Sequence, residues 1–258
     1  MLTYRRTNIA LGLVLLLLAA WQGYRGGLPW WAFALPLLLY SWVVFYGVYF
    51  IQSGFFMPTI WRAPRPLRAI ALSFDDGPSA DYTPQVLDIL REQGVKAAFF
   101  CIGKNIAGNE ALLARIHREG HLIGNHSFSH SVWFDLYSSS KMLADVQAAD
   151  RAVESVTGKR PLFFRPPFGV INPMLRDAIR QSGHRVIGWS LRSYDTVIND
   201  KHTLMARLLR LLQPGSIVLL HDHGKQTLDV LPDFIRAARE QGYEFQALDQ
   251  LIASQPYE

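Results

Sequence analysis

The sequence predicts an α/β fold with a mainly parallel sheet, closed or nearly closed into a barrel, behind a two-helix transmembrane hairpin. Two observations lead to this fold class. Beyond residue 68, short apolar runs alternate with amphipathic helical stretches and no internal repeat occurs, which is typical of β-α units with parallel strands. Before that point, residues 8–56 are apolar and aromatic, with Arg25 as their only charge. The 258 residues therefore accommodate one large domain and a membrane anchor.

The apolar N-terminal segment contains two spans, residues 8–24 and 28–51, joined by a short glycine-containing loop. As a helix of about 1.5 Å per residue, the second span covers about 36 Å, enough to cross a hydrocarbon core of about 30 Å. We therefore expect a transmembrane hairpin over residues 1–56 and a linker rich in proline and arginine over residues 57–68. A signal peptide and a re-entrant hairpin in one leaflet are the alternatives, but the second, longer span disfavours the signal peptide.

The arginines around the spans predict an orientation. Arginines flank both outer ends of the hairpin, whereas only Arg25 lies in the loop between the spans. The positive-inside rule therefore predicts a multi-pass protein of a bacterial-type inner membrane, with the following domain in the cytoplasm and an outward-facing domain as the alternative. Residues 1–61 carry three arginines and no acid, so three of the net five positive charges belong to this membrane end. No basic stripe with interleaved aromatic residues indicates a nucleic-acid partner.

The domain over residues 69–258 divides into elements by hydrophobic pattern. Apolar runs predict strands over residues 69–74, 96–102, 122–124, 162–165, 184–189 and 216–220. Amphipathic stretches predict helices over residues 83–90, 109–120, 138–157, 172–179, 204–212 and 231–241. Cys101 is the only cysteine, which excludes an intrachain disulfide, and its place in a strand indicates a packing role.

Four of the predicted strands run directly into unusual polar clusters. In chain order these are Asp75-Asp76, Asn125-His-Ser-Phe-Ser-His130, Arg165-Pro-Pro-Phe-Gly169 and His221-Asp222. Each one alone has an ordinary structural explanation, such as a turn, a surface pair or a solvated arginine. Because parallel strands place their carboxyl ends at one edge of the sheet, however, all four clusters are expected on the same face. Their joint placement indicates a functional site.

The chemistry of these clusters points to a metal ion. Adjacent carboxylates at the end of a buried strand repel each other unless a cation lies beside them. Two imidazoles and one carboxylate are a common ligand set for zinc with positions left open for water and substrate. Such an ion lowers the pKa of bound water and polarises a carbonyl. The second carboxylate is then free to act as a base, and a distant histidine can protonate the leaving group.

The four clusters resemble the motifs of the polysaccharide deacetylase family, the NodB homology domain or carbohydrate esterase family 4. The resemblance runs from Ala69 to the C-terminus, about three quarters of the chain. The matching motifs are Ser73-Phe-Asp-Asp-Gly77, His126-Ser-Phe-Ser-His130, Arg165-Pro-Pro-Phe-Gly169 and Leu220-His-Asp222. The resemblance implies a distorted, partly open (β/α) barrel of the NodB type that hydrolyses an N- or O-acetyl group on a sugar.

The resemblance also implies a role for each matched residue. Asp75 is expected as the general base, oriented and kept anionic by Arg165. His221 is expected as the general acid, with Asp195 as its supporting carboxylate. One divalent ion, Zn²⁺ with Co²⁺, Ni²⁺ or Mn²⁺ as alternatives, is expected on Asp76, His126 and His130. The residues expected to bind substrate are Pro167, Phe168, Gly169, Trp189 and Leu220, the last lining the acyl pocket.

One family motif departs from the pattern. The family often has Asp-x-x-Asp-Trp near a tryptophan-bearing strand. In this chain Arg192 and Thr196 stand where one aspartate and the tryptophan are expected, and Asp195 keeps the other carboxylate. The extra cation suits an anionic substrate, such as a sugar carried on a lipid phosphate.

The leading hypothesis is a membrane-anchored, metal-dependent hydrolase that deacetylates a sugar of a lipid-linked glycan, a cell-wall glycan or a polysaccharide. The alternatives are a deformylase or O-deacylase on a lipid-linked sugar, and a catalytically inactive carbohydrate-binding or scaffold protein. If the protein were inactive, we would expect the general base, a metal ligand or the general acid to be missing from the motifs, and none is missing. An HD-type phosphohydrolase needs further ligands on helices, whereas His221-Asp222 follows a strand. A glycosyltransferase needs an Asp-x-Asp site, which Asp75-Asp76 is not.

Overall fold

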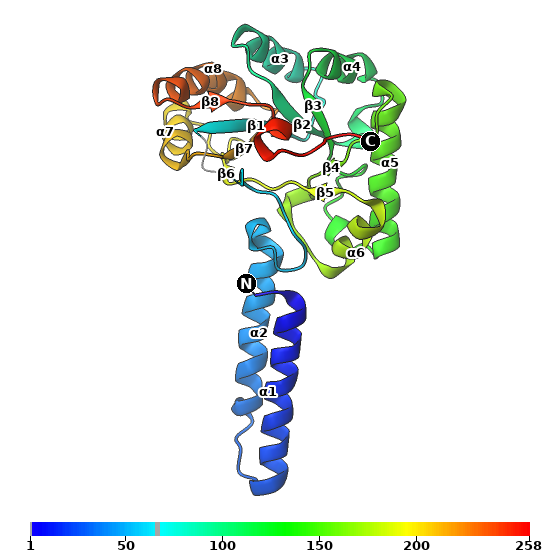
Figure 1. Ribbon diagram of the computed structural model, residues 1–258, viewed down its shortest axis with the longest axis vertical. Coiled ribbons are helices and arrows are strands. Elements are labelled where there is room, and N and C mark those ends of the chain that lie inside the picture. The colour runs from blue at the N-terminus through cyan, green and yellow to red at the C-terminus, as the bar shows by residue number, and fades with distance from the viewer. Residues whose placement is uncertain (1, 65–67) are drawn as a thin grey trace.

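The computed structural model describes residues 2–64 and 68–258, in which a helical hairpin projects from an α/β domain (Figure 1). The hairpin consists of α1 (Tyr4–Arg25) and α2 (Trp31–Tyr49), and both helices are long and apolar enough to cross a membrane. No residue of α1 is buried, and leucines lie exposed along its length. Exposed apolar side chains around a whole helix need an apolar environment, which a lipid bilayer supplies.

The helices of the hairpin begin and end at local signals. Thr3 caps α1, since its side chain accepts a hydrogen bond from the Arg6 amide at 3.4 Å. This cap lets α1 begin four residues before the predicted span. The chain at Pro29 forms a turn rather than a helix, so α2 begins at Trp31 instead of residue 28. A 3₁₀ turn, η1 (Ile51–Ser53), follows α2.

The domain is built on a curled parallel sheet. Its strands are β1 (Ala69–Asp75), β2 (Ala97–Cys101), β3 (Leu122–Asn125), β4 (Phe163–Phe164), β5 (Arg185–Val186), β6 (Leu191–Arg192), β7 (Ile217–His221) and β8 (Glu244–Phe245). Within the described residues their order is β5-β4-β3-β2-β1-β7-β6, with β8 beside β1. Every pairing between these strands is parallel. The order ends at β5 and β6, which leaves the barrel partly open, so the predicted fold class is confirmed.

Helices cover the outside of the sheet (Figure 1). They are α3 (Thr83–Glu92), α4 (Glu110–Arg118), α5 (Ser139–Thr157), α6 (Pro173–Ser182), α7 (Lys201–Leu211), α8 (Lys225–Glu240) and α9 (Leu248–Ile252). Single 3₁₀ turns also occur at η2 (Gly103–Asn105), η3 (Phe134–Leu136) and η4 (Pro167–Gly169). The central strand β1 is buried along its whole length. Side chains alternate along it, so Leu72 and Phe74 join the core beneath the helices while Ser73 and Asp75 take the opposite face.

Several short elements differ from the sequence prediction. The strand predicted over residues 184–189 is only β5, and β6, β8 and α9 were not predicted, because two-residue strands and a five-residue helix carry too little periodicity. Helix α8 begins at Lys225, six residues before its predicted start, with Pro232 inside it. Cys101 is fully buried, in agreement with a packing role.

The segment predicted as a linker is attached to the domain over its described part, and residues 65–67 lie outside the described residues. Ile60 forms a parallel bridge with Ile187, and its amide donates to the Val186 carbonyl at 2.9 Å. Ala63 donates to the Gly215 carbonyl at 2.9 Å. The exit of the hairpin is therefore held against the strands that end at the polar clusters.

Candidate active site

The site begins where β1 ends, at the adjacent carboxylates Asp75 and Asp76. Neighbouring side chains of a strand normally point to opposite faces. Asp76 has a φ of 75°, in the left-handed region, which breaks this alternation. Both carboxylates therefore reach the same imidazole. His126 Nε2 lies 3.8 Å from Asp75 Oδ2 and 3.4 Å from Asp76 Oδ1.

Asp76, His126 and His130 form a cluster suited to a metal ion. One ligand atom from each lies within 4.8 Å of the others, and His130 Nε2 is 3.3 Å from Asp76 Oδ1. The Asp76 Oδ1 atom is buried and has no hydrogen-bond partner among the described residues. A buried carboxylate oxygen without a donor is costly, and a divalent cation would satisfy it. The three residues therefore fit a metal site.

His126 is oriented for coordination by a backbone contact. Its Nδ1 lies 2.7 Å from the carbonyl oxygen of Arg165. Because a carbonyl only accepts, Nδ1 carries a proton, and Nε2 is the ring nitrogen that faces Asp76 and is available to a metal. Burial raises the pKa of Asp76, but the close imidazoles of His126 and His223 outweigh burial and lower that pKa far below its ordinary range. The carboxylate is therefore ionised.

Arg165 is fully buried, and it holds Asp75. Its Nη1 donates to Asp75 Oδ1 at 2.7 Å and to the Ser73 hydroxyl at 2.9 Å. Nε and Nη2 donate to the carbonyls of Ile187 and Gly188 at 3.1 Å and 3.0 Å. The guanidinium also stacks over the Phe100 ring, 4.0 Å from its centroid. A buried arginine with every nitrogen bonded fixes the neighbouring carboxylate in position.

His221 and Asp195 form the second charged pair. His221 Nδ1 lies 2.7 Å from Asp195 Oδ1, and the His221 amide donates to Asp195 Oδ2 at 2.7 Å. Burial lowers the pKa of His221, but the hydrogen bond and charge of Asp195 outweigh burial and raise that pKa above its ordinary value. Hydroxyls of Ser193 and Thr227 donate to Asp195 at 2.7 Å and 2.6 Å. His221 is thus held beside Asp75, its register partner on β1.

Comparison with known proteins agrees with this geometry. Residues 62–187 match the family model described as polysaccharide deacetylase. A peptidoglycan-N-acetylglucosamine deacetylase of Bacillus cereus is 34% identical over 197 residues, which cover 74% of this chain and 92% of that protein. This chain belongs to the polysaccharide deacetylase family.

Other members of the family are similar over most of the domain. The peptidoglycan-N-acetylmuramic acid deacetylase PdaA of Bacillus subtilis is 32% identical over 72% of both chains. The crystal structure of the Bc1960 peptidoglycan N-acetylglucosamine deacetylase superposes with a TM-score of 0.73 and 28% identity, covering 85% of this chain and 99% of that one. The chain spans 42% of the length of another relative, PgdA of Listeria monocytogenes. The predicted family is therefore confirmed, and with it a carbohydrate deacetylase domain of the NodB type.

Two residues follow β7 near the polysaccharide deacetylase site: His223, which the sequence prediction did not name, and Asp222, which it named only as part of a motif. His223 Nε2 lies 3.1 Å from Asp76 Oδ2, and this contact raises the pKa of His223 to about 9. Asp222 is fully buried, which raises its pKa to about 6, and it accepts a hydrogen bond from the Thr83 hydroxyl. His223 faces the site, whereas Asp222 ties β7 to α3. His223 lies in a turn after the last residue of β7, so no strand periodicity indicated it.

A pocket of about 290 Å³ lies over these groups. Besides the two aspartates and the histidines described above, it is lined by Pro166, Phe168, Gly169, Trp189, Arg192, Thr196 and Leu219. Gly169 has a φ of 75°, and a Cβ there would lie 2.4 Å from the Trp189 ring. Only glycine therefore allows the loop after β4 to approach Trp189 this closely. Arg192, at the divergent motif, lies over the rings of Trp189 and Tyr194, 5.6 Å and 5.0 Å from their centroids.

Two of the residues expected to bind substrate lie elsewhere. Leu220 is fully buried in the core beneath the helices, because it alternates with His221 along β7. Leu219 lines the pocket in its place. Pro167 is buried behind the loop, and Pro166 lines the pocket instead. Phe168, Gly169 and Trp189 lie where they were expected.

A second pocket of about 300 Å³ continues from the first. The two share Thr196, His221 and His223, and the second extends to Tyr82 and Lys225. The two pockets together form a groove with an acidic and imidazole-rich centre.

Proposed function

We propose that this protein is a metal-dependent deacetylase that removes an N-acetyl group from a sugar of a cell-wall glycan. The observation that carries the proposal is the separation of the two adjacent carboxylates. Asp75 is bonded to Arg165 inside the barrel, while Asp76 faces two imidazoles with an unpaired oxygen. The two Bacillus relatives are named as peptidoglycan deacetylases, which supports this class of substrate.

The donor set of the cluster favours zinc. Asp76, His126 and His130 would hold the ion, and a set of two imidazoles and one carboxylate is typical of Zn²⁺, with Co²⁺, Ni²⁺ and Mn²⁺ as alternatives. When bound, a divalent ion polarises the acetyl carbonyl and lowers the pKa of a water molecule beside it. Asp75, which Arg165 holds in position, is placed to remove a proton from the attacking water.

Bond breaking at nitrogen needs a proton from the other side of the site. Water oxygen adds to the acetyl carbon, the C–N bond breaks, and the products are acetate and a free amine. His221 is protonated at pH values below its raised pKa, and it donates that proton to the leaving nitrogen. Asp195 holds the imidazole in the required orientation through Nδ1. The pair thus acts as the general acid and its orienting carboxylate.

The first alternative is a catalytically inactive protein on the same fold. The base, the three residues of the metal cluster and the acid are all present and line one pocket, which disfavours this alternative. The second alternative is a deformylase or O-deacylase, which uses the same groups on a smaller or differently linked acyl group. Assays with N-formyl and O-acetyl sugars alongside the N-acetyl substrate separate these activities.

We further propose that α1 and α2 form a transmembrane anchor beside the substrate. Both helices carry exposed apolar side chains, and the arginines of the first turn of α1 lie at the domain end of the hairpin. By the positive-inside rule the domain faces the cytoplasm, where a cell-wall glycan is within reach as its lipid-linked precursor. An anchor raises the local concentration of enzyme at such a substrate. A reporter fused after Glu258, active on one side of the membrane only, tests the orientation, and activity outside the cytoplasm contradicts it.

The direct test of the activity is acetate release by the purified full-length protein. The substrates are N-acetylglucosamine oligosaccharides and peptidoglycan fragments. Acetate release is expected with metal, is lost after chelation and returns when Zn²⁺ is added. Release that continues unchanged after the bound metal has been removed and its absence verified contradicts the proposal.

A further inference from the structure

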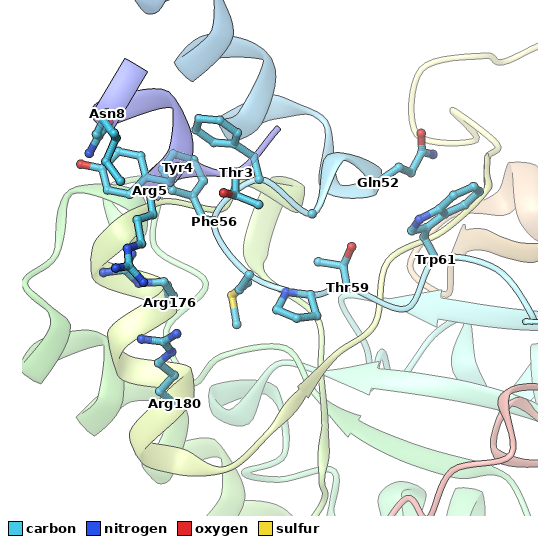
Figure 2. A pocket seen from close by; sticks show the side chains of 15 residues that line it. Thr3, Tyr4, Arg5, Asn8, Gln52, Phe56, Thr59, Trp61, Arg176 and Arg180 are labelled. Atoms are coloured by element: carbon cyan, nitrogen blue, oxygen red, sulfur yellow. The ribbon is translucent and has the colours of Figure 1, made fainter. Parts of the chain in front are cut away.

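A large cavity lies outside the catalytic site, where the hairpin meets the domain. Its volume is about 900 Å³. The first turn of α1, the segment over residues 52–61 and the outer side of α6 enclose it (Figure 2). No step of the proposed hydrolysis uses this cavity.

One side of the cavity is lined by three arginines. Arg5 comes from α1, and Arg176 and Arg180 come from α6, four residues apart and therefore on one face of that helix. Figure 2 shows all three along the same side, opposite Gln52 and Trp61. Only Arg176 has a carboxylate partner, since its Nη2 lies 2.8 Å from Asp177 Oδ1. In the described part of the chain no carboxylate lies within 4.0 Å of the nitrogens of Arg5 or Arg180, so the cavity carries excess positive charge.

The rest of the lining is apolar. Phe55, Phe56 and Met57 are buried residues of the segment after α2, and they also line the cavity. Tyr4 packs on Phe56, with ring centroids 5.1 Å apart, and the Arg176 guanidinium lies over the Tyr4 ring at 5.8 Å. A ligand that suits this lining joins an anionic group for the guanidiniums to an apolar part for the aromatic floor.

The position of the cavity identifies where such a ligand comes from. It lies at the end of the hairpin where α1 begins and α2 exits, next to helices whose apolar side chains are exposed (Figure 1). If the hairpin crosses a bilayer, as proposed above, this end lies at the level of the lipid headgroups. Phosphate headgroups are the anions present there at high density, and juxtamembrane arginines bind them.

We propose that this cavity binds the phosphate headgroup of an anionic phospholipid, with Arg5, Arg176 and Arg180 as the phosphate-binding residues. The inference rests on the membrane hairpin of the proposed function and adds a binding site to it. Gln52 lines the cavity and donates through Nε2 to the Trp189 carbonyl at 2.9 Å, and Trp189 lines the catalytic pocket. A lipid held here therefore fixes the orientation of the catalytic groove relative to the membrane surface.

The test measures lipid retention by the full-length protein in detergent. Phosphatidylglycerol and phosphatidylcholine are titrated separately, and bound lipid is counted by native mass spectrometry. The variant is Arg176→Gln/Arg180→Gln, which keeps helix-forming side chains in α6. The matched control is Arg118→Gln/Arg151→Gln, which removes two exposed arginines of α4 and α5 that do not line the cavity. The single variant Arg180→Gln, at an exposed residue, serves if the double variant does not fold.

We expect the wild type to bind phosphatidylglycerol in preference to phosphatidylcholine. The double variant should lose about 25-fold in phosphatidylglycerol affinity, since each arginine at an anionic membrane surface contributes about fivefold. Arg180→Gln should lose about fivefold, and the control should stay within about twofold of wild type. Equal losses in the control and the cavity variant would overturn the proposal, as would wild-type affinity in the cavity variants.

Two further arms separate the remaining explanations. Glycerol 1-phosphate is added as a soluble competitor, and displacement of the lipid by millimolar competitor would mean a site for free phosphate esters and overturn the lipid assignment. Extraction of cell membranes with alkaline carbonate tests the anchor, and release of the protein would overturn both the anchor and the lipid site. Acetate release from a soluble oligosaccharide is followed on the same samples. Its absence, with lipid preference intact, would contradict the deacetylase function while supporting the lipid site.

Discussion

Arg165 offers the sharpest test of how the site is built, through the substitution Arg165→Lys. Lysine keeps the positive charge beside Asp75, but its single nitrogen cannot also reach the carbonyls of Ile187 and Gly188, which Arg165 binds at 3.1 Å and 3.0 Å. Each hydrogen bond to a charged group contributes about 1.5–3 kcal/mol. The loss of two therefore lowers the free energy of unfolding by about 3–6 kcal/mol. For a domain of this size each kcal/mol shifts the apparent Tm by about 2–4 °C.

The assay is thermal unfolding of the full-length protein in detergent, with Arg151→Lys as the control at an exposed arginine. We expect Arg165→Lys to lower the apparent Tm by at least about 6 °C and the control to leave it unchanged. Activity should fall as well, because the freed carbonyls belong to the segment that carries Trp189. An apparent Tm within 2 °C of wild type, taken here as roughly the error of the assay, would refute the reasoning that these two carbonyl contacts are structurally important.

Three other predictions follow from individual contacts. Asp195→Asn removes the charge that raises the pKa of His221, so the alkaline limb of the pH–rate profile should move to lower pH. An alkaline limb at the wild-type pH would contradict the role of His221 as the general acid. Gly169→Ala places a Cβ 2.4 Å from the Trp189 ring and should cost about 1–3 kcal/mol of packing, measured as a fall of roughly 2–12 °C in apparent Tm, with the wild-type apparent Tm as the contrary result. Burial lowers the pKa of His121 to about 4, below the ordinary value of 6.5. The unfolded chain therefore binds a proton at His121 more readily than the folded protein does. The stability that this difference provides above pH 6.5 is accordingly lost as the pH falls toward 4. The loss is up to about 3 kcal/mol, and it should shrink in His121→Gln when apparent Tm is followed against pH.

The sequence alone was sufficient for the residues at the ends of long strands. Asp75 ends a fully buried strand of seven residues, with Asp76 directly after it, and His221 ends a strand of five, so parallel pairing brings them together as predicted. These strands also carry motifs whose order and spacing are specific to the family. The alternation of β1 did not predict that both carboxylates face the same site, since that depends on the left-handed backbone at Asp76.

The remainder of the site depends on contacts that leave little trace in the sequence. Leu220 was assigned to the pocket by motif, whereas strand alternation places Leu219 there. His223 acts across space on Asp76 from a loop without periodicity. The cavity under α1 joins Arg5 to Arg176, residues more than 170 positions apart, through helix packing that no local pattern encodes.

The central claim is that Asp75 and Asp76, although adjacent, have different tasks, and paired measurements of metal content and acetate release test it most directly. In Asp75→Asn we expect one bound metal ion per chain, as in wild type, with acetate release reduced by about 10²–10⁴-fold. In Asp76→Asn we expect metal affinity itself to fall by at least about tenfold. Loss of the metal from Asp75→Asn, or wild-type metal affinity in Asp76→Asn, would contradict this division of roles.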